Sequence, residues 1–186
     1  MEALPARLRP FVVLALNTGM RRVELQALRW DDVDLSGGTL RIRRDKAGKG
    51  RWAVLNSEAR EALVSVRREQ KVLGPYVFCS PEGKALHNFE RDWNPALKVA
   101  MIPDFRFHDC RHTFASRLAM IGTDLYTVQR AGGWKTQVMV QRYAHLSPDH
   151  IKAAVERLAA SNSGRATGTK TGTAAAGENE ERAASA

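Results

Sequence analysis

Hydrophobic residues recur at intervals of three and four over several stretches of the chain, which is the spacing of helices that bury one face. The first stripe consists of Leu8, Phe11, Val12, Ala15 and Leu16. Thr18-Gly19 follows this stripe and is expected to end the helix. A short second helix is expected over residues 21–29.

Two short runs, residues 39–43 and 51–55, have the composition of β-strands. The segment between them, residues 45–50, is expected to be a hairpin loop. Val77-Phe78 is expected to add a third strand. The sheet is therefore predicted to be small and antiparallel.

Helical patterns dominate the rest of the chain. Ser57 is expected to be the N-cap of a helix with Leu63, Val66 and Leu73 on one stripe, closed by Gly74-Pro75. Further helical patterns cover residues 87–101, 108–121 and 124–131, and another surrounds Tyr143. The predicted fold class is mainly α with a small antiparallel β-sheet (α+β).

The C-terminal part of the chain is predicted to contain a last helix followed by a tail. Ser147-Pro148 offers an N-cap followed by a proline at the first helical position. The apolar stripe of that helix consists of Ile151, Ala154, Val155 and Leu158. From residue 161 onward the chain lacks aromatic and large aliphatic residues, so it cannot bury enough surface to offset its ordering entropy. We expect one folded domain over residues 1–160 and a flexible tail over residues 161–186.

The charge balance points to a polyanionic partner. The chain has 29 Lys and Arg against 20 Asp and Glu, a formal net charge of +9. Basic and acidic residues are equal in number in the predicted tail, so the whole surplus lies on residues 1–160. A basic body often binds nucleic acid, because neutralised phosphates release counterions. A merely soluble basic protein would have the same charge.

Several classes of protein are excluded or not indicated. No run approaches the ~18 apolar residues of a membrane-spanning helix, which excludes an integral membrane protein. The first residues, MEALPARLRP, contain no secretory signal, so we expect a cytoplasmic protein. Cys79 and Cys110 have no CxxC or His/Cys spacing, so they indicate neither a disulfide framework nor a zinc site. We expect no metal and no cofactor.

Some polar residues could act on a phosphate, although each also has an ordinary structural explanation. His108 and Arg111 in HDCRH share one helix face, where an imidazole and a guanidinium could meet one phosphate. Arg21, just beyond the first helix, could bind phosphate oxygens or pair with Glu24. Tyr143 in QRYAHLSP is either a nucleophile or a packing residue.

The predicted hairpin is unusually basic. Lys46 at its tip could reach a groove or donate a proton to a leaving oxygen, or could be solvated. Acidic residues in this stretch are limited to Asp45. With Arg22, the hairpin supplies the expected DNA contacts, which are Arg22, Arg41, Arg43, Arg44, Lys49 and Arg51.

Taken together, five blocks resemble the catalytic domain of the tyrosine recombinases, the phage integrase family. The blocks are TGMRRVEL at 18–25, KAGKGR at 46–51, HDCRH at 108–112, AGGW at 131–134 and RYAHLSP at 142–148. Their order and spacing agree with that family over about residues 5–158. The resemblance implies six catalytic residues, which are Arg21, Lys46, His108, Arg111, Trp134 and Tyr143. Trp134 stands where most members have histidine and some have tryptophan.

The resemblance also implies a mechanism. Tyr143 attacks a DNA phosphate to form a 3′-phosphotyrosine and release a 5′-hydroxyl. Arg21 and Arg111 stabilise the charge on the non-bridging oxygens. Lys46 protonates the leaving oxygen, and His108 assists transfer of the tyrosine proton. The phosphotyrosine conserves the bond energy, so the scheme requires neither ATP nor a metal.

Members of this family usually carry an amino-terminal DNA clamp, and we expect that domain to be absent here. We therefore expect weak, strongly salt-dependent binding to double-stranded DNA. We expect a monomer without DNA and a homotetramer on synapsed DNA, where the chain is associated with the nucleoid. Two other functions stay open: a type IB topoisomerase-like nicking and resealing enzyme, and a non-catalytic or regulatory integrase-like DNA-binding module.

Overall fold

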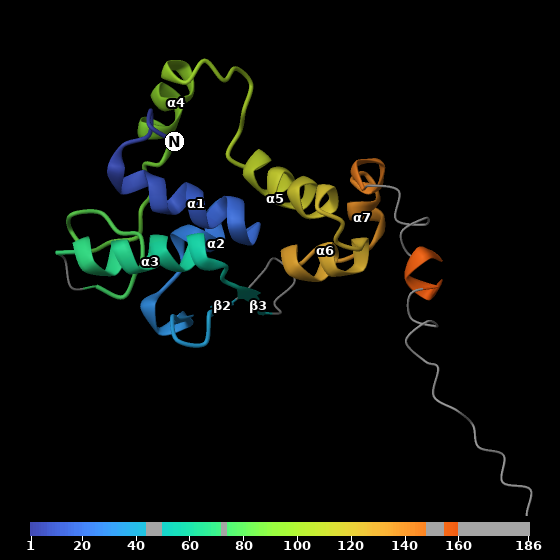
Figure 1. Cartoon of the computed structure of the whole chain (residues 1–186). Coiled ribbons are helices and arrows are strands. Elements are labelled where there is room, and N and C mark those ends of the chain that lie inside the picture. Colours follow the sequence, from blue (N-terminus) through green and yellow to red (C-terminus); the bar gives the residue numbers. More distant parts are fainter. Residues whose placement is uncertain (44–49, 72–73, 148–154, 160–186) are drawn as a thin grey trace, which may run out of the picture. The chain divides into compact units, whose positions relative to one another are not determined.

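In the computed structural model, residues 1–43, 50–71, 74–147 and 155–159 are described. They fall into two units, Met1–Pro148 and Asp149–Ala186. In the second unit residues 155–159 are helical, and both Val155 and Leu158 are exposed. The rest of the predicted apolar stripe, Ile151 and Ala154, lies outside the described residues, as does the whole of the predicted tail, residues 161–186. The first unit contains the sheet and all numbered helices (Figure 1).

The first predicted helix, α1 (Arg9–Thr18), is the central element of the first unit. A 3-10 turn, η1 (Ala6–Leu8), leads into it, and Pro10 lies in its first turn, where a missing N–H costs nothing. Gly19 ends it in the left-handed conformation with φ of 63°, as predicted. The flanks of α1 pack against α3 (Ser57–Glu69) and α5 (Asp109–Met120) (Figure 1).

The sheet has three antiparallel strands in the order β1 (Val33–Asp34), β2 (Thr39–Ile42), β3 (Arg51–Val54). The two predicted strands are confirmed, with Leu40 opposite Ala53. The predicted third strand at Val77-Phe78 is wrong, because β1 takes that place in the sheet. Both residues are buried, but their backbone makes irregular contacts, including a bond from Val77 N–H to the Leu28 carbonyl. The apolar pair therefore signalled burial and not sheet pairing.

The remaining helices follow the predicted order with shifted ends. They are α2 (Arg22–Gln26), η2 (Trp30–Asp32), α4 (Glu90–Val99), α6 (Leu125–Gly132), α7 (Val138–Gln141) and η3 (Ala144–Leu146). Asn56, and not the predicted Ser57, caps α3, because its side chain accepts a bond from the Ala59 N–H at 3.0 Å. The fold is thus mainly helical with a small antiparallel sheet, as predicted.

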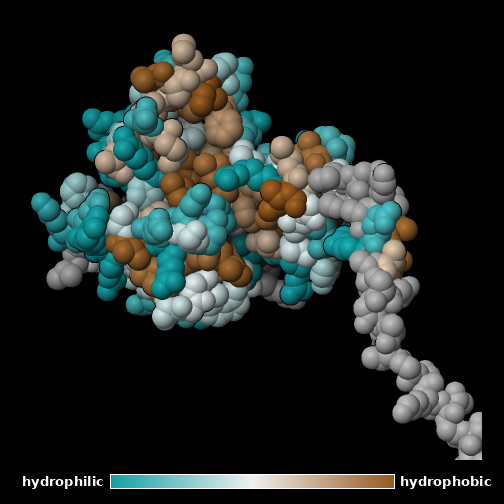
Figure 2. Space-filling model, in the orientation of Figure 1, coloured by the Kyte–Doolittle hydropathy of each residue, from teal (hydrophilic) through white to brown (hydrophobic). Residues whose placement is uncertain are grey.

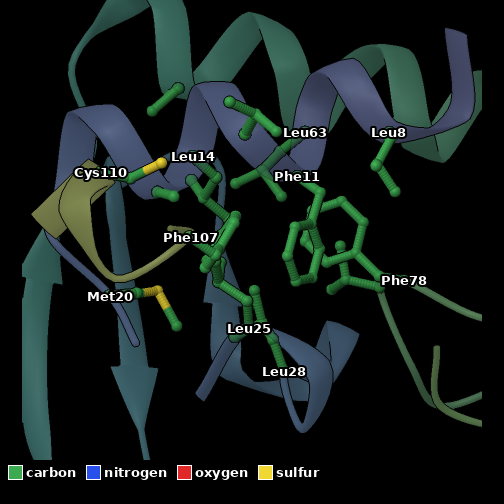
Figure 3. Close-up of a cluster of buried hydrophobic side chains, with 14 of the residues drawn as sticks. Leu8, Phe11, Leu14, Met20, Leu25, Leu28, Leu63, Phe78, Phe107 and Cys110 are labelled. Atoms are coloured by element: carbon green, nitrogen blue, oxygen red, sulfur yellow. The ribbon is translucent and has the colours of Figure 1, made fainter. Parts of the chain in front are cut away.

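Phe11 of α1 lies at the centre of the main core (Figure 3). It is fully buried, and its ring centroid lies 4.9 Å from that of Phe78 and 5.3 Å from those of Phe89 and Phe107. One aromatic side chain therefore joins α1 to three later segments. Cys110 is buried in the same core, where burial raises the pKa of its thiol to about 12.

A second, smaller core lies between α5, α6 and α7. Its buried members are Phe114, Ala115, Ala119, Val128, Trp134, Val140 and Tyr143. Helix α5 contributes to both cores, with Cys110 in the first and Phe114 in the second. The residue between the two faces, Arg111, is therefore held at the junction of the two cores.

The face shown in Figure 2 carries both hydrophilic and apolar areas, and the apolar areas include the region of α4. At the end of α4, Val99 and Met101 are strongly exposed. Within the described residues, none of the helices combines the length and the hydrophobicity needed to cross a lipid bilayer.

We expect Phe11→Ala to lower the free energy of unfolding by about 3–5 kcal/mol, because it leaves a cavity lined by three aromatic rings. Urea denaturation followed by circular dichroism measures the change. Val99→Ala on the surface of α4 is the control, and its effect should stay within about 0.5 kcal/mol. Equal effects of the two substitutions would contradict the central place of Phe11.

Candidate active site

Arg111, the third residue of α5, is almost completely buried, with 2% of its surface exposed. Its Nη1 donates hydrogen bonds to the carbonyls of Gly19, at 2.6 Å, and Gly132, at 2.7 Å. Gly19 ends α1 and Gly132 is the last residue of α6. One guanidinium therefore binds two helix C-termini, where carbonyls lack intrahelical partners and the helix dipoles are negative.

The rest of the Arg111 guanidinium has the charge and the hydrogen-bond donor needed to bind an anion. It stacks on the indole of Trp134, 3.9 Å from the ring centroid. Burial lowers the pKa of Arg111 to about 10, and the neighbouring Arg21 and Arg51 act in the same direction. The group thus stays charged at neutral pH. Its Nη2 has no hydrogen-bond partner among the described residues, which leaves one donor for a ligand.

A buried carboxylate holds two further arginines. Glu24 Oε1 lies 2.8 Å from Arg21 Nη1, and Glu24 Oε2 lies 3.0 Å from Arg51 Nη2. Oε2 also accepts the backbone N–H of Arg21, the N-cap residue of α2. The pairing of Arg21 with Glu24, one of the two alternatives for this arginine, is thus present. It orients the Arg21 side chain, which remains about one third exposed.

His108 precedes the first residue of α5 and shares an open cleft of about 440 Å³ with Arg21. Burial lowers the pKa of His108, and the charges of Arg111 and Arg21 lower it further. The imidazole is therefore neutral at neutral pH. A phosphate in this cleft would meet the guanidinium of Arg21 and the imidazole of His108 from one side.

Tyr143 lies between α7 and η3 and is 4% exposed. Its ring packs in the second core, 6.2 Å from the centroid of Trp134. Its hydroxyl lies 2.5 Å from Nδ1 of His112. Burial raises the pKa of Tyr143, against the opposing effect of Arg142 and Arg111. The phenol is thus neutral at pH 7 and needs a base before it can act as a nucleophile.

Five of the six predicted catalytic residues converge in one region. They lie at the N-terminus of α2, at the N-terminus of α5, just after α6 and just after α7, and they are Arg21, His108, Arg111, Trp134 and Tyr143. The indole of Trp134 contacts both the guanidinium of Arg111 and the ring of Tyr143. Lys46 lies outside the described residues.

The predicted DNA contacts lie in different settings. Arg51 is mostly buried in the Glu24 pair, whereas Arg41 is exposed on β2. Arg43 forms a short ion pair with the buried Asp32, at 2.6 Å, and Arg22 pairs with Glu90. Arg44 and Lys49 lie outside the described residues.

Two residues that the sequence analysis gave no role contact the predicted site residues. Glu24 was considered only as a partner of Arg21, and its bond to Arg51 joins positions far apart in the chain. His112 stands in HDCRH one helical turn after His108, so the spacing that paired His108 with Arg111 also places His112 on this side of α5. Its contact with Tyr143 depends on the tertiary structure.

Comparison with known proteins gives a consistent result. The sequence profile described as "Phage integrase family" matches residues 1–150. The chain is 35% identical over 156 residues to the integrase of Salmonella phage P22, covering 77% of this chain and 40% of that protein. It is 30% identical over 134 residues to the shufflon-specific DNA recombinase of Escherichia coli, covering 72% of this chain and 33% of the relative. The chain thus spans less than half the length of these two curated relatives.

Solved structures show the same fold. The crystal structure of XerA recombinase superposes with a TM-score of 0.66 at 26% identity, covering 82% of this chain and 57% of that one. The catalytic domain of bacteriophage HP1 integrase superposes with a TM-score of 0.62 at 25% identity, covering 81% of each chain.

We expect Arg111→Lys to lower the free energy of unfolding by about 1–3 kcal/mol, because an ammonium cannot both bridge the two carbonyls and stack on the indole. Thermal unfolding measures the loss. Arg117→Lys, on the exposed side of the same helix, is the matched control and should change little. A Tm for Arg111→Lys equal to that of the control would show that the bridge between α1 and α6 contributes nothing.

Proposed function

The chain belongs to the phage integrase family, and from this premise we propose that it is a site-specific DNA recombinase that cuts and rejoins strands through a 3′-phosphotyrosine intermediate. The observation that carries the proposal is that one indole, Trp134, contacts both the buried Arg111 and Tyr143, within one unit of one chain. A buried phenol next to a cationic site with an unpaired donor fits attack on a phosphodiester. The same placement supports cleavage in cis, by the tyrosine of the subunit that binds the phosphate.

Each residue then has a distinct part. Arg21 and Arg111 stabilise the negative charge on the two non-bridging oxygens of the phosphate. Arg111 Nη2 is covered by the chain, so a phosphate contact there requires a small local opening. Trp134 stacks on the guanidinium of Arg111 and also contacts the ring of Tyr143. Lys46 is the proposed donor of the proton to the leaving 5′-oxygen.

The proposed substrate is double-stranded DNA, acted on in the cytoplasm at the nucleoid. The net charge of +9 supports a polyanionic substrate. The names of the curated relatives, an integrase and a DNA recombinase, favour recombination over relaxation of a single duplex. We propose that the chain is a monomer without DNA and a homotetramer on two synapsed duplexes, with residues 1–160 as the catalytic domain.

The proposal predicts a covalent protein–DNA adduct on a nicked substrate whose short cleaved strand escapes. Tyr143→Phe should abolish the adduct, because it removes the only atom that attacks the phosphorus. Tyr126→Phe, an exposed tyrosine on α6, is the matched control and should leave the adduct unchanged. A denaturing gel reads out the result. DNA binding without an adduct would favour the non-catalytic DNA-binding module, and relaxation without strand exchange would favour the topoisomerase.

The affinity for DNA should fall steeply with salt. If about five phosphates are neutralised, the dissociation constant should rise roughly 10²- to 10³-fold between 50 and 200 mM salt. Filter binding over this series measures the slope. Arg41→Gln, which removes one exposed charge from β2, should reduce the slope of log K against log salt by about one. An affinity that does not change with salt would contradict binding through phosphates.

A further inference from the structure

One short polar contact at the candidate site involves a residue that has no role in the scheme above. Tyr143 Oη and His112 Nδ1 lie 2.5 Å apart, shorter than an ordinary hydrogen bond between these groups. Because the tyrosine oxygen is the atom that would attack the phosphate, whatever binds its proton controls its reactivity. His112 is the group in that position.

The geometry of α5 places His112 there. His108 and His112 are one turn apart, and their rings meet edge to face with centroids 5.1 Å apart. The Tyr143 ring follows, 6.2 Å from that of His112. His108 lines the cleft with Arg21, whereas His112 contacts the nucleophile. The two histidines therefore face different partners, and no hydrogen bond joins His108 to Tyr143 among the described residues.

The surroundings of His112 lower its pKa and so favour the neutral imidazole, which can accept a proton. Burial lowers the pKa of His112, and His108, Arg142 and Arg111 lower it further, while Asp109 acts in the opposite direction. These groups come from α5 itself and from the end of α7, where Tyr143 also faces the ring. A neutral imidazole with its proton on Nε2 presents a lone pair at Nδ1, which matches the position of the tyrosine hydroxyl.

We propose that His112 is the general base that takes the proton of Tyr143 as the tyrosine attacks DNA. The inference rests on the proposed recombinase function and deepens it. As the Tyr143 Oη–P bond forms, the hydroxyl proton passes to Nδ1 of His112, which becomes an imidazolium. The bond from phosphorus to the 5′-oxygen breaks, and that oxygen leaves with the electron pair and takes up a proton, for which Lys46 is the proposed donor. Religation reverses each transfer.

This assignment changes the expected part of His108. The resemblance gave the tyrosine proton to His108, but the contact with the hydroxyl belongs to His112. His108 instead faces the cleft that Arg21 lines, where it can bind a phosphate oxygen. A base is needed because a phenol with a pKa near or above ~10 is ionised in fewer than about one molecule in a thousand at pH 7.

The test is the rate of adduct formation by the full chain and its His112→Asn variant. Asparagine can accept a hydrogen bond near the Nδ1 position but cannot take up a proton. We expect the rate to fall about 10²-fold. His145→Asn is the matched control, because His145 is exposed on η3 just after the tyrosine and should tolerate the change.

Two readouts separate a base from a merely structural residue. The first is a substrate with sulfur in place of the leaving 5′-oxygen, which departs without protonation because a thiol has a pKa of about 8.5. The His112→Asn defect should persist on this substrate, since it concerns the attacking group. A defect that disappears there would place His112 on the leaving-group side and overturn the proposal.

The second readout is the pH profile. The base must be neutral to work, so the wild-type rate should fall as the pH drops below about 6.5, through the lowered pKa of His112, and should level off above it. In His112→Asn the tyrosine must ionise by itself, so the rate should rise about tenfold per pH unit from 6 to 9. A variant that keeps the wild-type rate and profile would overturn the proposal.

A measurement without DNA tests the contact directly. In ¹⁵N-histidine spectra of the full chain, His112 should be the Nε2–H tautomer, and Tyr143→Phe should change its shifts and raise its pKa. A proton on Nδ1, or spectra insensitive to Tyr143→Phe, would overturn the assignment of His112 even where cleavage is intact. Absence of any adduct from the wild-type chain would instead count against the recombinase function, and the proposal would fall with it.

Discussion

The arrangement of the site depends on one buried guanidinium. Arg111 joins the C-terminus of α1 to that of α6, and so connects the main core to the second core. A buried charge of this kind is tolerated only when polar groups surround it, and here two helix ends and an indole supply them. The residue proposed to bind the phosphate is therefore also the one that holds the site's two halves together. A substitution of Arg111 would therefore affect both phosphate binding and the packing of the site.

Close packing around this arginine explains the two glycines that accept its bonds. At Gly19, which has a positive φ, an added Cβ would lie 2.5 Å from the Phe114 ring. At Gly132, an added Cβ would overlap the Trp134 ring that supports the guanidinium. The small residues allow both carbonyls to approach one nitrogen. The tight fit leaves Arg111 little freedom, which is the preorganisation that electrostatic catalysis requires.

The charged residues at the site leave it with a net positive charge. Glu24 neutralises one of three neighbouring arginines, which leaves a net positive site where a phosphate would bind. Burial lowers the pKa of both histidines, and the positive charges nearby lower it further, so both stay neutral at pH 7. A neutral histidine can accept a proton, and a charged one could not. Burial and the positive charges that would attract the substrate thus act together to keep the proposed base neutral.

The sequence by itself determined the fold class, the order of the elements, the end of α1 at Gly19 and the family. These depend on the spacing of residues close together in the chain and on short sequence motifs. It also indicated Arg21, His108, Arg111, Trp134 and Tyr143 as one set, although only as a resemblance. The tertiary structure decided the rest: that Val77-Phe78 is buried coil and not a strand, that Glu24 serves two arginines, and that His112 rather than His108 contacts the nucleophile. These outcomes depend on residues that are 27 or more positions apart, and local patterns carry no information about such contacts.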